Sequence, residues 1–186
     1  PDGHESAWTM VENFHLGYNM GNNLESNPYG SWWHGTTPKD YETAWGQPEI
    51  TAKTIDALKA KGINVVRIPV TWYPHIPNFN KTYTGNDGDY TISADWMKRV
   101  KEVVDMVKDA GMYCIINIQH DGGAYNKSGD PNSAWLHADE DYDNVTKIYQ
   151  AIWKQIATEF KDYDEKLIFE SFNEILNKAS SWTAPD

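Results

Sequence analysis

Residues 62–72 read Gly-Ile-Asn-Val-Val-Arg-Ile-Pro-Val-Thr-Trp, and this stretch decides the fold. Residues 65–70 are apolar except for Arg67, and they follow a helical pattern over residues 52–62 that ends at a glycine. An apolar run of this kind, without polar alternation, is typical of a strand buried on both faces in a parallel sheet. The stretch therefore predicts a unit made of a helix, a glycine stop and a buried strand.

The same unit occurs once more along the chain, and a third helix and strand follow without a glycine stop. Residues 93–111 begin with a serine that suits a helix N-cap, carry apolar residues at spacings of three and four, and end at a glycine before the apolar run 113–118. A third helical pattern over residues 145–160 precedes the apolar run 167–172, and another apolar run, residues 14–20, precedes the first helix. The predicted order is four strands with a helix between each pair.

Strands that alternate with helices in this way predict an α/β protein with a parallel sheet. One architecture is an open doubly wound sheet, but no glycine-rich phosphate-binding motif follows any predicted strand. The other is a (β/α)8 barrel, which needs about 250 residues. On this interpretation residues 1–186 are the N-terminal half of a TIM barrel catalytic domain, completed by another chain or by a second copy.

Composition narrows the class of partner. The formal net charge is −11, which disfavours nucleic acid and anionic membranes, and no apolar stretch has the roughly 20 residues of a membrane span. Aromatic residues make up 13% of the chain, with nine Trp and eleven Tyr, so we expect some rings to lie at a surface or cleft. A neutral polysaccharide fits both observations.

Every predicted strand places polar side chains at its C-terminal end. In α/β proteins this end of the sheet forms the site, and polar groups in a buried sheet require partners. An Arg within a strand is more often an ion-pair partner inside a barrel than a catalyst. The functional interpretation therefore depends on the presence of polar residues at the ends of all four strands. The residues are Asn19, Asn22, Asn23, Glu25, Arg67, Trp72, Asn117, Gln119, His120, Asp121, Asn173 and Glu174.

Five segments together resemble the first half of glycoside hydrolase family 5, in particular its bacterial endo-β-1,4-glucanase, xyloglucanase and lichenase-like subfamily. They are residues 17–22 (Gly-Tyr-Asn-Met-Gly-Asn), 42–48 (Glu-Thr-Ala-Trp-Gly-Gln-Pro), 62–72 as quoted, 116–123 (Ile-Asn-Ile-Gln-His-Asp-Gly-Gly) and 169–174 (Phe-Glu-Ser-Phe-Asn-Glu). The resemblance covers nearly the whole chain. It implies a retaining hydrolase of β-1,4-linked glucan, and from the residues themselves we expect no metal or other cofactor.

The resemblance also implies roles for individual residues. Glu174 would be the acid/base catalyst, Asn173 would hold the sugar 2-hydroxyl, and Arg67 would orient the nucleophilic carboxylate. The Trp45 and Trp72 rings would stack on pyranose faces. Asn22 would also contact the substrate.

The chain departs from the family pattern at two places. The family often has His-His at the end of the third strand and Pro after the catalytic Glu, whereas this chain has Gln119-His120 and Ile175. Because neighbouring strand residues point to opposite faces, either Gln119 or His120 occupies the substrate-facing His position. We assign His120 to catalysis and Gln119 to substrate binding, where an amide can hydrogen-bond a sugar hydroxyl but cannot supply an imidazole.

A larger departure concerns the nucleophile. In the family this Glu lies on the seventh strand, beyond residue 186, and a retaining pair needs two carboxyl groups about 5 to 5.5 Å apart. Glu25 and Asp121 lie at other strand ends and are poor substitutes. We therefore expect the chain alone to be inactive, with its exposed sheet edges covered by a complementary C-terminal half or by self-association.

Two other interpretations remain. A non-catalytic carbohydrate-binding or scaffold module could use the same aromatic surface, but it would not need an Asn-Glu pair together with Arg67. An unrelated open α/β protein lacks a phosphate loop. We expect a secreted protein whose signal peptide is not part of this chain, and the six His and one Cys show no metal-ligand spacing.

Overall fold

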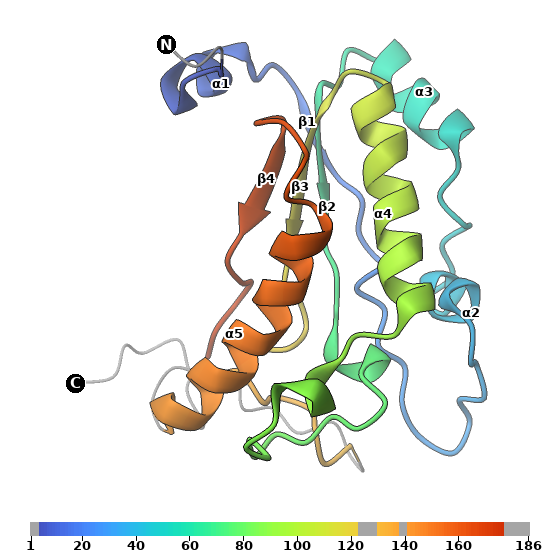
Figure 1. The fold of residues 1–186 in the computed structure, drawn as a ribbon. Helices are drawn as coiled ribbons and strands as arrows, with labels where there is room; N and C mark the ends of the chain where they lie inside the picture. Colours follow the sequence, from blue (N-terminus) through green and yellow to red (C-terminus); the bar gives the residue numbers. More distant parts are fainter. Residues whose placement is uncertain (1–3, 123–129, 138–140, 177–186) are drawn as a thin grey trace.

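The computed structural model describes residues 4–122, 130–137 and 141–176. Its centre is one parallel sheet in which the strands follow the order of the chain, β1-β2-β3-β4 (Figure 1). The strands are β1 (Gly17–Asn19), β2 (Val65–Ile68), β3 (Tyr113–Asn117) and β4 (Leu167–Glu170). The four predicted strands and their parallel arrangement are thus present, each shorter than the apolar run that predicted it.

Three helices connect the strands and lie together on one side of the sheet (Figure 1). They are α3 (Ala52–Ala60), α4 (Ala94–Asp109) and α5 (Tyr142–Glu159). The hydroxyl of Ser93 accepts a hydrogen bond from the Trp96 amide at the start of α4, which confirms the predicted N-cap. Gly62 and Gly111, which follow α3 and α4, have φ values of 85° and 79°, a left-handed conformation that favours glycine.

Four short elements lie outside the predicted pattern. They are α1 (Ala7–Asn13), α2 (Pro38–Thr43) and two 3-10 helices, η1 (Tyr73–His75) and η2 (Asp87–Tyr90). The segment before α1 is held to the N-terminal side of the sheet, since the Tyr113 hydroxyl donates to Glu5 and His4 contacts Glu165. α2, η1 and η2 belong to the long connections after β1 and β2, at the opposite end of the strands (Figure 1).

The hydrophobic core lies between the sheet and the three helices. Apolar side chains of β2 and β3 pack against one face of α4 and of α5, and their relative exposure is 8% or less. Cys114 is among them, and burial raises the pKa of its thiol. The helical spacing in the sequence therefore identified the buried helix faces correctly.

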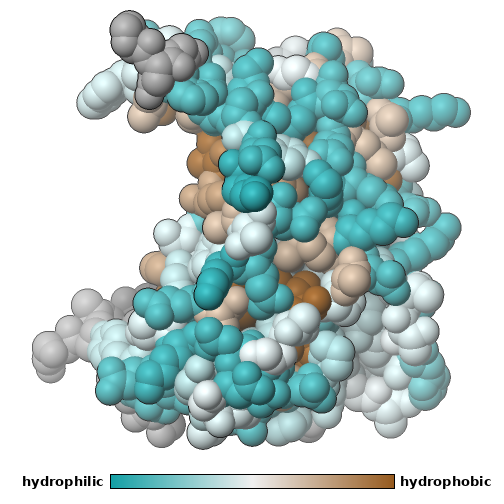
Figure 2. Space-filling model, in the orientation of Figure 1, coloured by the Kyte–Doolittle hydropathy of each residue, from teal (hydrophilic) through white to brown (hydrophobic). Residues whose placement is uncertain are grey.

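The other face of the sheet is open. β1 and β4 form its two edges, all three residues of β1 are exposed, and Arg67 and Ile115, which the register pairs on β2 and β3, are only partly buried. Figure 2 shows a hollow on this side of the molecule, between the α1 end and the loops at the C-terminal ends of the strands. Within the described residues, no helix has the length and apolar character needed to cross a bilayer.

Candidate active site

Arg67 is the centre of a hydrogen-bonded cluster at the C-terminal end of the sheet. Its guanidinium makes two bonds of 2.6 Å to the Glu170 carboxylate, a bidentate pair. It also donates to the side-chain oxygens of Asn19 at 2.7 Å, Gln119 at 3.1 Å and Asn173 at 3.1 Å. One side chain on β2 thereby links the ends of all four strands.

Asn117 completes the cluster from β3. Its amide donates to Gln119 at 2.6 Å and to Glu170 at 3.0 Å, while its oxygen accepts from the Val70 amide at 3.1 Å. The sheet register pairs Asn117 with Glu170, which explains their proximity. The Arg67 guanidinium is the main reason that the pKa of Glu170 lies below its usual range, and this carboxylate raises the pKa of Arg67 in turn.

Glu174 lies just beyond this cluster on the turn that follows β4. Its side chain is exposed and its backbone φ is 44°, a left-handed value that costs a non-glycine residue about 1–3 kcal/mol. The preceding Asn173 amide donates to the Ile118 carbonyl at 2.8 Å. A Cβ added to Gly122 would lie 3.0 Å from the carbonyl oxygens of Asn173 and Glu174, so glycine is needed for this close approach.

Trp45 and His120 form the aromatic part of the site. Their ring centroids are 5.5 Å apart in an edge-to-face arrangement, Trp45 is 37% exposed and His120 is half-buried. The backbone amide of His120 donates to the Thr71 hydroxyl at 3.2 Å, and this bond fixes the backbone that carries the imidazole. The structure thus places His120 beside Trp45, whereas Gln119 belongs to the Arg67 cluster.

A buried ion pair holds the segment that carries Trp45. Arg99 on α4 donates to both carboxylate oxygens of Glu42, at 2.8 and 2.9 Å, and Glu42 has 0% relative exposure. Glu42 also accepts from the Ile50 amide at 2.6 Å, and the Asn23 amide group donates to the Pro48 carbonyl at 2.9 Å. Residues 42–48, part of the sequence pattern, are therefore anchored to the core at both ends.

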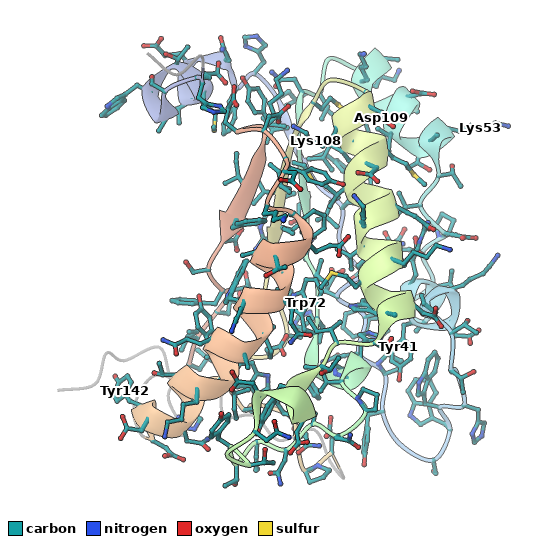
Figure 3. All side chains as sticks on the ribbon, viewed as in Figure 1. Tyr41, Lys53, Trp72, Lys108, Asp109 and Tyr142 are labelled. Atoms are coloured by element: carbon teal, nitrogen blue, oxygen red, sulfur yellow. The ribbon has the colours of Figure 1, made fainter. Side chains whose placement is uncertain are left out.

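The predicted role of Trp72 is wrong. Its ring has 0% relative exposure, and its indole N–H donates to the Asn117 carbonyl at 2.8 Å, so no face is available to a sugar. Figure 3 labels Trp72 among the side chains enclosed by the helices and loops. Asn22, in contrast, is exposed and has a φ of 67°. Its backbone N–H donates to the buried Glu25 carboxylate.

Asp121 has a structural role in the same region. Its carboxylate accepts from the backbone amides of Trp72 and Tyr73, both at 3.2 Å, and from the Trp135 indole at 2.7 Å. Complete burial raises its pKa to about 6, although these three donors act in the opposite direction. Asp121 therefore joins the connections that follow β2 and β3.

Glu170 was not among the predicted site residues. A signal existed in the sequence, because Glu170 is the only Asp or Glu in the four apolar runs and Arg67 is the only Lys or Arg. An Arg in a buried strand requires an acceptor, and pairing the two would have identified the contact. Among the described residues, no group of three or more His, Cys, Asp and Glu side chains could hold a metal ion.

Comparison with known proteins extends the structural evidence. Residues 27–185 match the family model described as cellulase (glycosyl hydrolase family 5). This chain belongs to glycosyl hydrolase family 5. The expected family is therefore confirmed, and with it the fold: four parallel strands in chain order are the first half of a (β/α)8 barrel.

Individual relatives of this family 5 chain are endoglucanases. It is 38% identical over 162 residues to Endoglucanase A of Paenibacillus barcinonensis, covering 87% of this chain and 35% of the relative. It is also 38% identical to the xyloglucan-specific endo-β-1,4-glucanase of Bacteroides ovatus, covering 91% of this chain and 30% of that enzyme.

Solved structures agree with the sequence comparison. A GH5-4 broad specificity endoglucanase from an uncultured bacterium superposes with a TM-score of 0.82 at 40% identity, covering 96% of this chain and 44% of that one. The family 5 enzyme of Prevotella bryantii, solved with a xyloglucan tetradecasaccharide, gives 0.81 at 40% identity and covers 98% and 48%. The chain thus spans less than half the length of these relatives.

Proposed function

We propose that this chain supplies the acid/base half of a retaining endo-β-1,4-glucanase, with Glu174 as the acid/base residue. The main support is the position of the Asn173-Glu174 pair, which follows β4 directly beside the Arg67 cluster. Asn173 is fixed there by its bond to Arg67 at 3.1 Å, and Glu174 is exposed. An exposed carboxyl group next to a fixed amide can meet a glycosidic oxygen while the amide holds the neighbouring sugar hydroxyl.

In the proposed reaction, protonated Glu174 donates its proton to the leaving glycosidic oxygen. The resulting carboxylate then removes a proton from the water that hydrolyses the glycosyl-enzyme intermediate. Asn173 binds the sugar 2-hydroxyl, Asn22 and Gln119 contact other hydroxyls, and Trp45 stacks on a sugar ring with His120 behind it. These assignments rest on exposure and position at the strand ends.

The nucleophile belongs to the other half of the proposed barrel. Within the Arg67 cluster the carboxylate is that of Glu170, but both its oxygens accept hydrogen bonds from Arg67 and one also accepts from Asn117. A carboxylate held by three donors is a poor nucleophile. In the completed barrel we expect Arg67 to orient the incoming nucleophilic carboxylate as well, and we expect the chain alone to be inactive.

A complementary C-terminal half is the proposed partner. The open face of the sheet and the edge strands β1 and β4 provide the surfaces on which it would add strands. A second copy of this chain could cover the same edges but would bring the acid/base residue again and no nucleophile. The proposed substrate is a β-glucan polysaccharide, and because such polymers do not enter cells, we propose that the protein acts after secretion.

Hydrolysis by a chimaera tests the proposal. This chain would be joined to the C-terminal half of the Prevotella bryantii enzyme, and reducing ends released from mixed-linkage glucan would be measured beside the chain alone. We expect activity only in the chimaera, and a loss of at least about a thousandfold in its Glu174→Gln variant. A chimaera that binds glucan without hydrolysing it would instead favour the non-catalytic binding module.

A further inference from the structure

A second groove lies outside the Arg67 cluster, between the connections that follow β1, β2 and β3. Its volume is about 660 Å³, within the range of sites that hold organic ligands. No residue of the Arg67 cluster, and neither Glu174 nor Trp45, contributes to its lining. Its lining includes Tyr29, Trp33, Tyr41, Tyr73, Phe79 and Asp130.

Aromatic rings form the walls, and the core holds them in place. Trp33 contacts Tyr41 edge-to-face at 5.1 Å, Tyr41 contacts His75 at 4.5 Å, and His75 stacks on the fully buried Trp96 at 3.5 Å. Tyr29 is 44% exposed at the rim of the groove. Rings fixed in this way lose little conformational freedom when a ligand stacks on them.

The floor of the groove carries fixed polar groups. The buried Asp130 carboxylate accepts from the Tyr73 hydroxyl at 2.9 Å and from the Asn132 amide at 2.9 Å. A carboxylate can accept about four hydrogen bonds, so Asp130 can also accept from hydroxyl groups of a ligand. The Asn132 side chain is itself held, because its amide group donates to the Phe79 carbonyl at 3.0 Å.

The charge of the lining selects the class of ligand. Asp130 is the only charged residue among the lining residues, which disfavours phosphates and other anions. His75 lies behind the lining residue Tyr41, and burial lowers its pKa to about 3, so it adds no positive charge near the groove at physiological pH. Aromatic faces beside a hydrogen-bond acceptor suit an uncharged, hydroxyl-rich ligand with flat apolar faces.

We infer that this groove is a second binding site for a β-linked glucan chain, separate from the site of hydrolysis. The inference rests on the proposed function, which supplies a glucan as the polymer present. β-1,4-Linked glucose units form an extended ribbon with apolar ring faces and equatorial hydroxyls at the edges. The faces stack on the groove rings, Tyr29 among them, and the hydroxyls bond to Asp130.

Cellohexaose binding to the 186-residue chain tests this inference by titration calorimetry. All proteins would carry Glu174→Gln so that turnover cannot interfere. Tyr29→Ala removes an exposed ring of the groove, and Ser31→Trp fills its mouth. Trp32→Ala is the matched control, because Trp32 is 65% exposed on the same loop but does not line the groove. Maltohexaose, with α-linkages and a coiled shape, is the control ligand.

We expect each groove variant to weaken cellohexaose binding about tenfold, the Trp32→Ala control to change it less than twofold, and maltohexaose to bind at least tenfold more weakly than cellohexaose. Equal cellohexaose binding by parent, Tyr29→Ala and Ser31→Trp would overturn the inference, as would no binding by the parent. Neither result affects the chimaera assay, in which loss of hydrolysis depends on Glu174. Failure of the groove and failure of the proposed catalytic role are therefore distinguishable.

Discussion

At the scale of single residues, the Arg67–Glu170 pair determines the arrangement of the site. Both side chains are about three-quarters buried, and the pair sits where four strands end. A bidentate guanidinium–carboxylate contact fixes both distance and orientation, so it aligns Asn173 and Gln119 through the same guanidinium. The site therefore depends on a residue that does not itself need to touch substrate.

Glu170→Gln should test the energetic part of this view. The amide keeps the shape of the carboxylate but leaves the charge of Arg67 without compensation, so the free energy of unfolding should fall by about 1–3 kcal/mol. Glu12→Gln on α1 is the matched control, because Glu12 is exposed and should change stability by less than about 0.5 kcal/mol. Urea unfolding of both variants decides the point, and equal effects would contradict a stabilising pair.

Asp121 predicts a dependence of stability on pH. Its pKa is about 6 in the folded chain against an ordinary value of 3.8, so the folded state holds the proton more tightly. The stability gained from protonated Asp121 is fully present below about pH 4 and is lost as pH rises through 6. Its full size is about 3 kcal/mol, since each pKa unit corresponds to about 1.4 kcal/mol.

The Asp121→Asn variant isolates this contribution. It cannot ionise, so the parent should lose up to about 3 kcal/mol relative to the variant between pH 4 and pH 7, as measured by urea unfolding at both values. Comparing the two proteins at each pH cancels the titration of other groups. A stability difference that is constant with pH, or that shifts in favour of the parent as pH rises, would refute the assignment.

At the scale of elements, the sequence predicted the strands and the three large helices because each has a periodic or continuous apolar pattern. α1 has no such pattern, since none of its residues is buried in the described structure. α2 did have a signal: Thr37 and Asp40 form a capping box and Pro38 occupies the first turn. The fate of Trp72 could not be predicted, because an aromatic ring at a strand end suits the core as well as a cleft.

The segment that carries Trp45 should depend on the buried Glu42–Arg99 pair. Arg99→Met keeps the bulk of the side chain but leaves Glu42 as a buried charge without its partner, and the loss of stability should reach about 3–5 kcal/mol. Lys98→Met, one residue earlier on α4 and exposed, should cost less than about 0.5 kcal/mol. Chemical unfolding measures both, and a cost below about 1 kcal/mol for Arg99→Met would argue against the pair as an anchor.

At the scale of the whole molecule, the chain provides a helix-covered sheet with one face open and an acid/base candidate at its end. The parallel sheet was predictable from the repeated helix–strand units, and the resemblance to glycoside hydrolase family 5 favoured a half barrel over an open doubly wound sheet. The hydrogen-bond partners of Arg67 were harder to predict, because they depend on register across four strands that are far apart in the sequence. The second groove was not predicted, since its walls come from three long connections whose relative positions depend on the folded sheet.

The role of Glu174 is tested most directly by the product that the Glu174→Ala chimaera forms from an activated aryl β-cellobioside in the presence of azide. Azide needs no general base, so it should replace water in attacking the glycosyl-enzyme intermediate and restore turnover. If Glu174 is the acid/base residue, β-cellobiosyl azide with retained configuration accumulates in Glu174→Ala and not in the parent chimaera. An α-configured azide, or no effect of azide on an inactive variant, would contradict Glu174 as the acid/base residue.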